Sequence, residues 1–308
     1  MLTPQHALER AQNLVSQAMK AGADAADAVY VCEASTEVQV RLGQLEDVAR
    51  SEGEDIGLRV FVGQRSATIS SSNMNPDILA GLVTRAIDMA KEAPEDQYAG
   101  LAPQDRLLTG SIPDFDSDDG LDPDPALLRA AALECEDAAR AVPGVSNSEG
   151  AGASAGRSIF ALATSHGFAG VKSGSGYSIS ASVLSGDDDA KERDYDWHSA
   201  RHMADLDSAT KIGTRAGERA VKRLNPGTVK SGQMPVVFDP RVGGSFVGHL
   251  LGGISGSAIA RKTSFLLESL GAQLFDSSIS IVDDPHRMRG LGSRAFDGEG
   301  LPTLRRSI

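Results

Sequence analysis

The chain has 308 residues, with 30 Lys and Arg against 42 Asp and Glu, so its formal net charge is −12. This length is typical of two or three domains, and the negative charge argues against nucleic acid as a direct partner. No run of about 18 apolar residues is present, so we expect no membrane span. The two cysteines, Cys32 and Cys135, are far apart. So few thiols favour a reducing compartment, and we predict a cytoplasmic protein with both cysteines buried.

Four helices are predicted from their first residues, where a capping side chain precedes an apolar stripe. In three of them proline takes the first helical position, which suits its fixed φ angle and missing N–H. The predicted starts are Thr3-Pro4, Asn75-Pro76, Asp124-Pro125 and either Asp207 or Ser208. Between the first and second helices, over 27–72, apolar and polar residues alternate as in antiparallel strands. The same alternation occurs between the third and fourth helices, over 145–197. The sequence therefore predicts two modules with the order helix, antiparallel meander, helix.

These patterns predict an α+β protein in which the two modules precede a mixed α/β C-terminal domain. The predicted segments are an N-terminal module at 1–102, an acidic proline-rich linker at 103–125, a middle module at 126–228 and the C-terminal domain at 229–308. The linker composition cannot bury much apolar surface. In the last segment, Pro235-Val-Val-Phe is predicted to form a short buried strand. We expect this domain to be truncated, with uncovered strand edges and apolar surface.

Two short motifs resemble known sites but have a simpler interpretation. The acidic run Asp114–Gly120 resembles a calcium loop, yet its sixth and twelfth positions are Asp119 and Pro125, where that loop needs Gly and Glu. A solvated linker is favoured. Ser154 lies in a G-x-S-x-G pattern, and Asp187–Asp189 and His198 follow in the chain order of a hydrolase triad. The alternating pattern after this serine favours a hairpin of small residues instead.

A third candidate is a metal site at His198 and His202. Their spacing of four residues would place both imidazoles on one face of a helix, with Asp194 or Asp196 near enough to complete the site. Two histidines without an identified third ligand are weak evidence for a metal. We therefore favour a partly exposed histidine pair, and keep the metal site as an alternative.

Two longer stretches carry a family resemblance. They read EDVARSEGEDIGLRVFVGQRSA at 46–67 and GHLLGGISGSAIARKTSFL at 248–266. Both resemble the TldD/PmbA family, and within it the PmbA (TldE) branch, which is also known as a modulator of DNA gyrase. The resemblance extends over essentially the whole chain. It implies a cytoplasmic metalloprotease assembly in which a TldD-like catalytic subunit carries zinc and a PmbA-like subunit pairs with it. Unfolded peptides are the implied substrates, with roles in proteolysis and peptide maturation.

The resemblance also indicates what this chain lacks. The catalytic branch of the family has a His, then a Glu, then a second His five residues after the first. At the matching positions this chain has Gly248, His249 and Gly253. We therefore expect no metal, no other cofactor and no catalytic residue in this chain, and zinc in the TldD-like partner. Four residues that match the family are expected to form a peptide or partner region, namely Arg261, Lys262, Thr263 and Ser264.

Two alternatives stay open at this point. The chain could be an autonomous metallopeptidase with a relocated site at His198 and His202, or a non-enzymatic binding protein linked to DNA gyrase. The resemblance also leaves open whether homodimers form in the absence of the TldD-like partner.

Overall fold

The computed structural model describes residues 3–187 and 190–308. It contains two compact units. The larger unit holds the chain up to Asn225 together with Asp283–Arg306, and the smaller unit holds Pro226–Val282 with Ser307–Ile308. The predicted N-terminal module and residues 126–225 of the predicted middle module therefore belong to the larger unit. Residues 226–228 belong to the smaller unit, and the predicted C-terminal segment is divided between the two.

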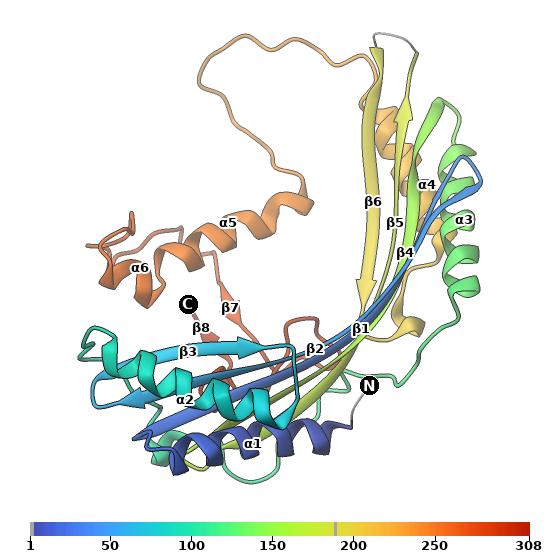
Figure 1. Cartoon of the computed structure of the whole chain (residues 1–308). Helices are drawn as coiled ribbons and strands as arrows, with labels where there is room; N and C mark the ends of the chain where they lie inside the picture. The colour runs from blue at the N-terminus through green and yellow to red at the C-terminus, as the bar shows by residue number, and fades with distance from the viewer. Residues whose placement is uncertain (1–2, 188–189) are drawn as a thin grey trace. The chain divides into compact units, whose positions relative to one another are not determined.

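The larger unit is built on one antiparallel sheet. Across the described ranges, this sheet has six strands in the order β3-β2-β1-β4-β5-β6 (Figure 1). The strands are β1 (Ala25–Arg41), β2 (Gln44–Val62), β3 (Arg65–Ser71), β4 (Val145–Thr164), β5 (Ala169–Ser185) and β6 (Glu192–Ala200). Each predicted meander supplies three neighbouring strands, and β1 pairs with β4 from Asp27↔Thr164 to Val40↔Ala151. The α+β class and the order helix, meander, helix are confirmed, and the two meanders are halves of one sheet.

All four predicted helices form at their predicted starts. They are α1 (Pro4–Lys20), α2 (Pro76–Glu92), α3 (Pro125–Arg140) and α4 (Ala209–Lys222). In each of them the capping side chain accepts a backbone N–H of the first turn, and the caps are Thr3, Asn75, Asp124 and Ser208. These bonds satisfy donors that have no partner within the helix. Of the two candidates for the fourth cap, Ser208 takes the position.

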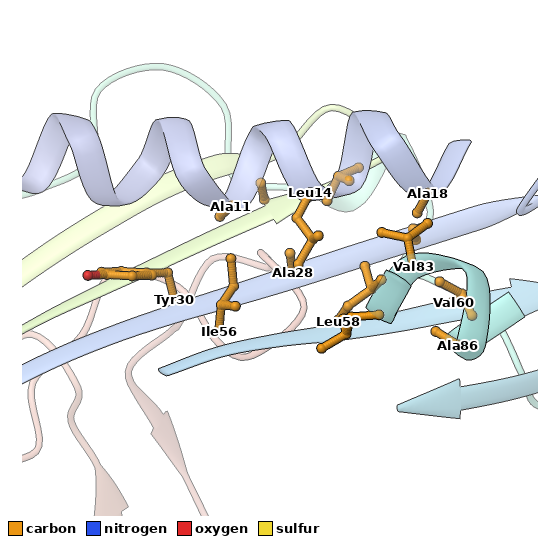
Figure 2. Close-up of a cluster of buried hydrophobic side chains, with 14 of the residues drawn as sticks. Ala11, Leu14, Ala18, Ala28, Tyr30, Ile56, Leu58, Val60, Val83 and Ala86 are labelled. Atoms are coloured by element: carbon orange, nitrogen blue, oxygen red, sulfur yellow. The ribbon is translucent and has the colours of Figure 1, made fainter. Parts of the chain in front are cut away.

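The helices of both modules cover the same face of the sheet. Successive side chains of a strand point to opposite faces, so even-numbered residues of β1 share one face. Tyr30 belongs to the apolar core under α1 and α2, and Val38 belongs to the core under α3 and α4. Figure 2 shows Leu14 of α1, Ile56 of β2 and Val83 of α2 among the side chains of the first core. One face of β1 therefore serves two cores in succession.

Both cysteines are free and buried, as predicted. Burial raises the pKa of Cys135 to about 12, so its thiol stays protonated at neutral pH.

The segment predicted as a solvated linker packs on the helix-free face of the sheet. It contains a short 3-10 helix, η1 (Gln104–Arg106), followed by Leu107, which is only 9% exposed. Leu107 joins a cluster with Leu162 of β4 and with Phe168 and Phe296. Most of residues 103–125 are exposed or partly exposed, as predicted, but a few of their apolar side chains contact the even-numbered face of β4, which the composition did not predict. None of the described helices is both long and apolar enough to cross a bilayer.

The turn between β1 and β2 offers a test of backbone strain. Leu42 and Gly43 form a two-residue loop with φ angles of 51° and 75°, as in a type I′ turn. Leucine is strained in this left-handed region, whereas asparagine tolerates it. We expect Leu42→Asn to raise the free energy of unfolding by about 1 kcal/mol, as measured by urea denaturation. Leu45→Asn, at an exposed position within β2, is the control and should bring no gain. If the Leu42→Asn protein is no more stable than the parent, Leu42 is not a strained residue of this turn.

The smaller unit contains α5 (Pro240–Gly253) and α6 (Gly256–Ala260), and two short strands, β7 (Val282–Asp283) and β8 (Arg306–Ser307), pair with each other. The strand predicted at 235–238 does not form, and Val236 and Val237 are 64% and 96% exposed. An extended run needs a neighbouring strand for its backbone hydrogen bonds, and no described strand pairs with this one. The apolar, β-branched composition of 235–238 therefore led to a wrong prediction of a strand.

Candidate functional site

The positions that match the family's zinc motif lie near the end of α5. Gly248 and His249 are exposed, and nothing lies within 4 Å of a Cβ atom built on Gly248. Gly253 is buried, and a Cβ atom there would lie 3.1 Å from the ring of Phe265 and 3.0 Å from Cδ1 of Leu266. Two of the three positions thus offer no side chain, and the third offers one exposed imidazole.

This donor set does not fit zinc. A catalytic zinc site uses three protein ligands and one open position for water or substrate. At the motif positions only His249 has a side chain that could coordinate a metal. In residues 3–187 and 190–308, no group of three or more His, Cys, Asp or Glu side chains is arranged to hold an ion. The motif positions therefore cannot by themselves supply the ligands of a catalytic zinc site.

The four family-matching residues after α6 form the turn that ends this helix. Thr263 N–H donates to the carbonyl of Ala258 at 3.0 Å, and Ser264 Oγ donates to the carbonyl of Gly253 at 2.6 Å. The two hydroxyl residues therefore hold the backbone of the α5–α6 segment. Arg261, Lys262 and Thr263 are exposed, and the first two carry the charged side chains with which this turn can reach another molecule.

The helical arrangement that the alternative metal site would need does not form, although both histidines are partly exposed, as the favoured prediction had them. His198 lies in β6, and His202 precedes a 3-10 helix, η3 (Met203–Asp205). Pairing with β5 keeps the backbone extended through Ala200. His198 Nδ1 accepts the N–H of Asp207 at 3.0 Å, while His202 Nε2 lies 3.2 Å from a carboxylate oxygen of Asp116. The two imidazoles therefore have separate partners, and Asp196 is ion-paired with two arginines of α4.

The serine motif does not have the geometry of a nucleophile. Ser154 lies in the middle of β4, which runs without interruption from Val145 to Thr164 between β1 and β5. A nucleophile elbow needs a sharp turn from strand into helix, and none occurs here. The predicted hairpin at this position is also wrong. Asp188 and Asp189 of the candidate triad lie outside the described residues.

The acidic run that resembles a calcium loop is bound to the sheet by its carboxylates. Asp118 pairs with Arg157 at 2.9 Å, and Asp119 accepts the hydroxyl of Tyr177 at 2.5 Å. Burial raises the pKa of both carboxyls, but their hydrogen bonds outweigh it and hold each pKa below its ordinary value. These carboxylates are therefore ionised anchors of the segment and not free metal ligands.

A pocket that was not predicted lies on the helix-free face of the larger unit. Its volume is about 540 Å³, and we call it the Lys172 pocket. Residues of β4 and β5, the segments 112–120 and 293–296, Pro4 and Arg201 line it. Because these residues come from widely separated parts of the chain, no local motif could have indicated the pocket.

Comparison with protein families matches three successive regions of the chain. Residues 26–90 match domain 1 of the PmbA/TldA metallopeptidases, 118–224 match the central domain, and 231–308 match the C-terminal domain. The three matches cover more than half of the chain. The chain belongs to the PmbA/TldD metallopeptidase family. The resemblance seen in the sequence is thereby confirmed.

Two bacterial relatives within this family align over 96% of the chain. Metalloprotease PmbA of Escherichia coli O157:H7 is 31% identical over 302 residues, which cover 67% of that protein. The Metalloprotease PmbA homolog of Haemophilus influenzae is 34% identical over 295 residues, which cover 65% of it. The chain therefore spans about two thirds of the length of these relatives.

Solved structures of the PmbA/TldD type share the fold. A protein of Bacteroides thetaiotaomicron, described as a modulator of DNA gyrase, is 27% identical, with a TM-score of 0.90 over 97% of this chain and 69% of its own. TldE from Thermococcus kodakarensis is 18% identical, with a TM-score of 0.77 over 96% of this chain and 66% of its own. At 18% identity the second likeness concerns the fold alone.

Proposed function

We propose that this chain is a PmbA/TldE-like subunit without a metal of its own, which pairs with a zinc-bearing TldD-like subunit that hydrolyses unfolded peptides. The observation that carries the proposal is the set of residues at the end of α5. There the two positions that match the family's histidines are Gly248 and Gly253, and the position of the glutamate is His249. A glycine cannot coordinate zinc, and one imidazole cannot replace three ligands.

The segment around these positions supports a retained structural role. The Thr263 and Ser264 hydrogen bonds fix the turn after α6, and they leave the exposed Arg261 and Lys262 beside it. A supporting subunit would keep the family's framework and lose only the ligand set. The proposed division of labour therefore places metal chemistry in the partner and peptide or partner binding in this chain.

Hydrolysis of an unfolded peptide tests the pairing directly. The substrate is incubated with this chain, with a TldD-like subunit, and with both, each with and without a chelator. We expect hydrolysis only in the mixture, and we expect the chelator to abolish it, because the zinc is contributed by the partner. Chelator-sensitive hydrolysis by this chain alone would contradict the proposal, as would full activity of the TldD-like subunit alone.

A second measurement tests the ligand set without relying on activity. We expect the purified chain to hold well below one equivalent of zinc by elemental analysis, and we expect His249→Ala to leave that content and the activity of the mixture unchanged. The matched variant is His202→Ala, which probes the alternative site. One equivalent of zinc that is lost in either variant would show that this chain has its own metal site.

A further inference from the structure

The Lys172 pocket has an apolar side and a cationic side. The apolar side is formed by the side chains of Ile112, Phe160 and Phe296. Phe296 is only 3% exposed and its ring lies 6.3 Å from that of Phe160, so this side of the pocket is a fixed surface. The cationic side is formed by Lys172, Arg201 and Arg294. A cavity of this kind is suited to a small ligand that is apolar at one end and negatively charged at the other.

The three cations have no carboxylate partner within the described ranges. Arg201 donates to two backbone carbonyls, those of Ser175 at 3.0 Å and Leu291 at 2.6 Å, and its buried Nε atom has no hydrogen-bond partner. Lys172 Nζ lies 5.0 Å from the centre of the Phe160 ring. Neither Lys172 nor Arg294 forms an ion pair in the part of the chain that the structure describes. The guanidinium of Arg201 is thus held in place by the backbone and not neutralised.

The cations are close enough to repel one another. Loss of hydration in the pocket lowers the pKa of Lys172, and the charges of Arg294 and Arg201 lower it further. Like charges that converge without a partner destabilise the empty pocket, and an anion between them would remove that cost. The electrostatics therefore favour a negatively charged ligand at this side.

The carboxylates that also line the pocket form no ion pair with these cations among the described residues. Asp118 is paired with Arg157, and Asp119 accepts the hydroxyl of Tyr177. Asp114 accepts the N–H of Asp116 through one of its oxygens, which leaves the other available to a donor. The lining thus contains hydrogen-bond acceptors as well as the three cations. A compact dianion such as phosphate would be repelled by these acceptors and would leave the apolar side unfilled.

We infer that the Lys172 pocket binds the C-terminal carboxylate of a peptide. The α-carboxylate would lie among Lys172, Arg201 and Arg294, and an apolar last side chain would lie against Phe160 and Phe296. A peptide N–H has an acceptor in Asp114. This inference rests on the proposed function in one respect, because it takes unfolded peptides as the ligand class.

The test measures binding to the chain alone and involves no hydrolysis. The probe is an unstructured ten-residue peptide that ends in leucine, with a fluorophore at its N-terminus, and its affinity is measured by fluorescence anisotropy. We expect the peptide with a free C-terminus to bind, and the C-terminal amide to bind at least about tenfold more weakly. We also expect inorganic phosphate at matched ionic strength not to displace the peptide. Equal affinity of acid and amide, or displacement by phosphate, would overturn the inference.

Variants locate the effect in the pocket. Arg294→Gln and Lys172→Met each remove one charge and are expected to weaken the acid about tenfold while leaving the affinity for the amide nearly unchanged. Arg106→Gln is the matched control, because this exposed arginine does not line the pocket. All three are checked by thermal unfolding. If the peptide with a free C-terminus keeps its affinity in both pocket variants, the inference is wrong. This outcome is distinguishable from failure of the proposed function, because hydrolysis by this chain together with the TldD-like subunit is measured separately.

Discussion

Gly213→Ala is expected to lower the free energy of unfolding by about 3 kcal/mol, the upper end of the usual range for overpacking. A Cβ atom on Gly213 would lie 2.0 Å from the carbonyl oxygen of Cys135 and 3.0 Å from the amide nitrogen of Ala139. Both atoms belong to the backbone of α3, so no side chain can rotate away from the contact. The substitution therefore forces α3 and α4 apart. Urea denaturation followed by circular dichroism measures the change.

The matched control is Gly81→Ala in α2. Gly81 is also a glycine within a helix, but nothing lies within 4 Å of a Cβ atom there. Because alanine is the better helix former, we expect this variant to gain about 0.5–1 kcal/mol. Opposite signs for the two substitutions would show that close approach of α3 and α4 is the cause. Two losses of similar size would contradict that explanation.

The helix that carries Gly213 shows how far sequence reasoning reaches. The period of its apolar residues and the cap at Ser208 predicted α4 correctly, because both signals are local. The need for glycine at 213 was not predicted, since it depends on the distance to α3. The neighbour of β4 in the sheet was not predicted either, and the many small residues of this strand make its apolar–polar alternation weak. Its pairing with β1 joins segments more than 100 residues apart, which no local signal reports.

In the candidate site, too, features that are local in the sequence could be predicted, and features that depend on tertiary contacts could not. The motif positions from Gly248 to Ser264 could be found because they are contiguous in sequence and match a known family pattern. The Lys172 pocket could not be found, because Phe160, Lys172, Arg201 and Arg294 become neighbours only when the sheet and the coil on its helix-free face are in place. The helical arrangement considered for His198 and His202 was wrong for a related reason. Spacing alone does not distinguish a helix from a strand, and pairing with β5 decided the conformation of His198.

Glu136→Ala is expected to cost about 3 kcal/mol of unfolding free energy, because it leaves two backbone donors without the charged acceptor and empties a buried position. Glu136 lies on α3 and is fully buried. Its two carboxylate oxygens accept the N–H groups of Leu42 at 2.7 Å and Gly43 at 2.8 Å, in the turn between β1 and β2. A side chain of the middle module thus holds a turn of the N-terminal module. Glu218→Ala on α4 is the control, since this side chain is exposed, and it should change stability by less than about 0.5 kcal/mol.

The same carboxylate gives a pH dependence of known sign. Burial raises the pKa of Glu136, but hydrogen bonds from Ser148, Gly43 and Leu42 outweigh it and hold the pKa below its ordinary value of 4.5. As pH falls below that value, the unfolded chain binds a proton at this residue before the folded chain does, so folding loses stability. The contribution of Glu136 is present above pH 4.5 and is lost as the pH falls through the lowered pKa of the folded state. We therefore expect Glu136→Gln, which removes the titration and keeps the shape, to show a weaker decline in stability below pH 4.5 than the parent protein. Parallel declines for the two proteins would mean that Glu136 is not held as a carboxylate by the turn.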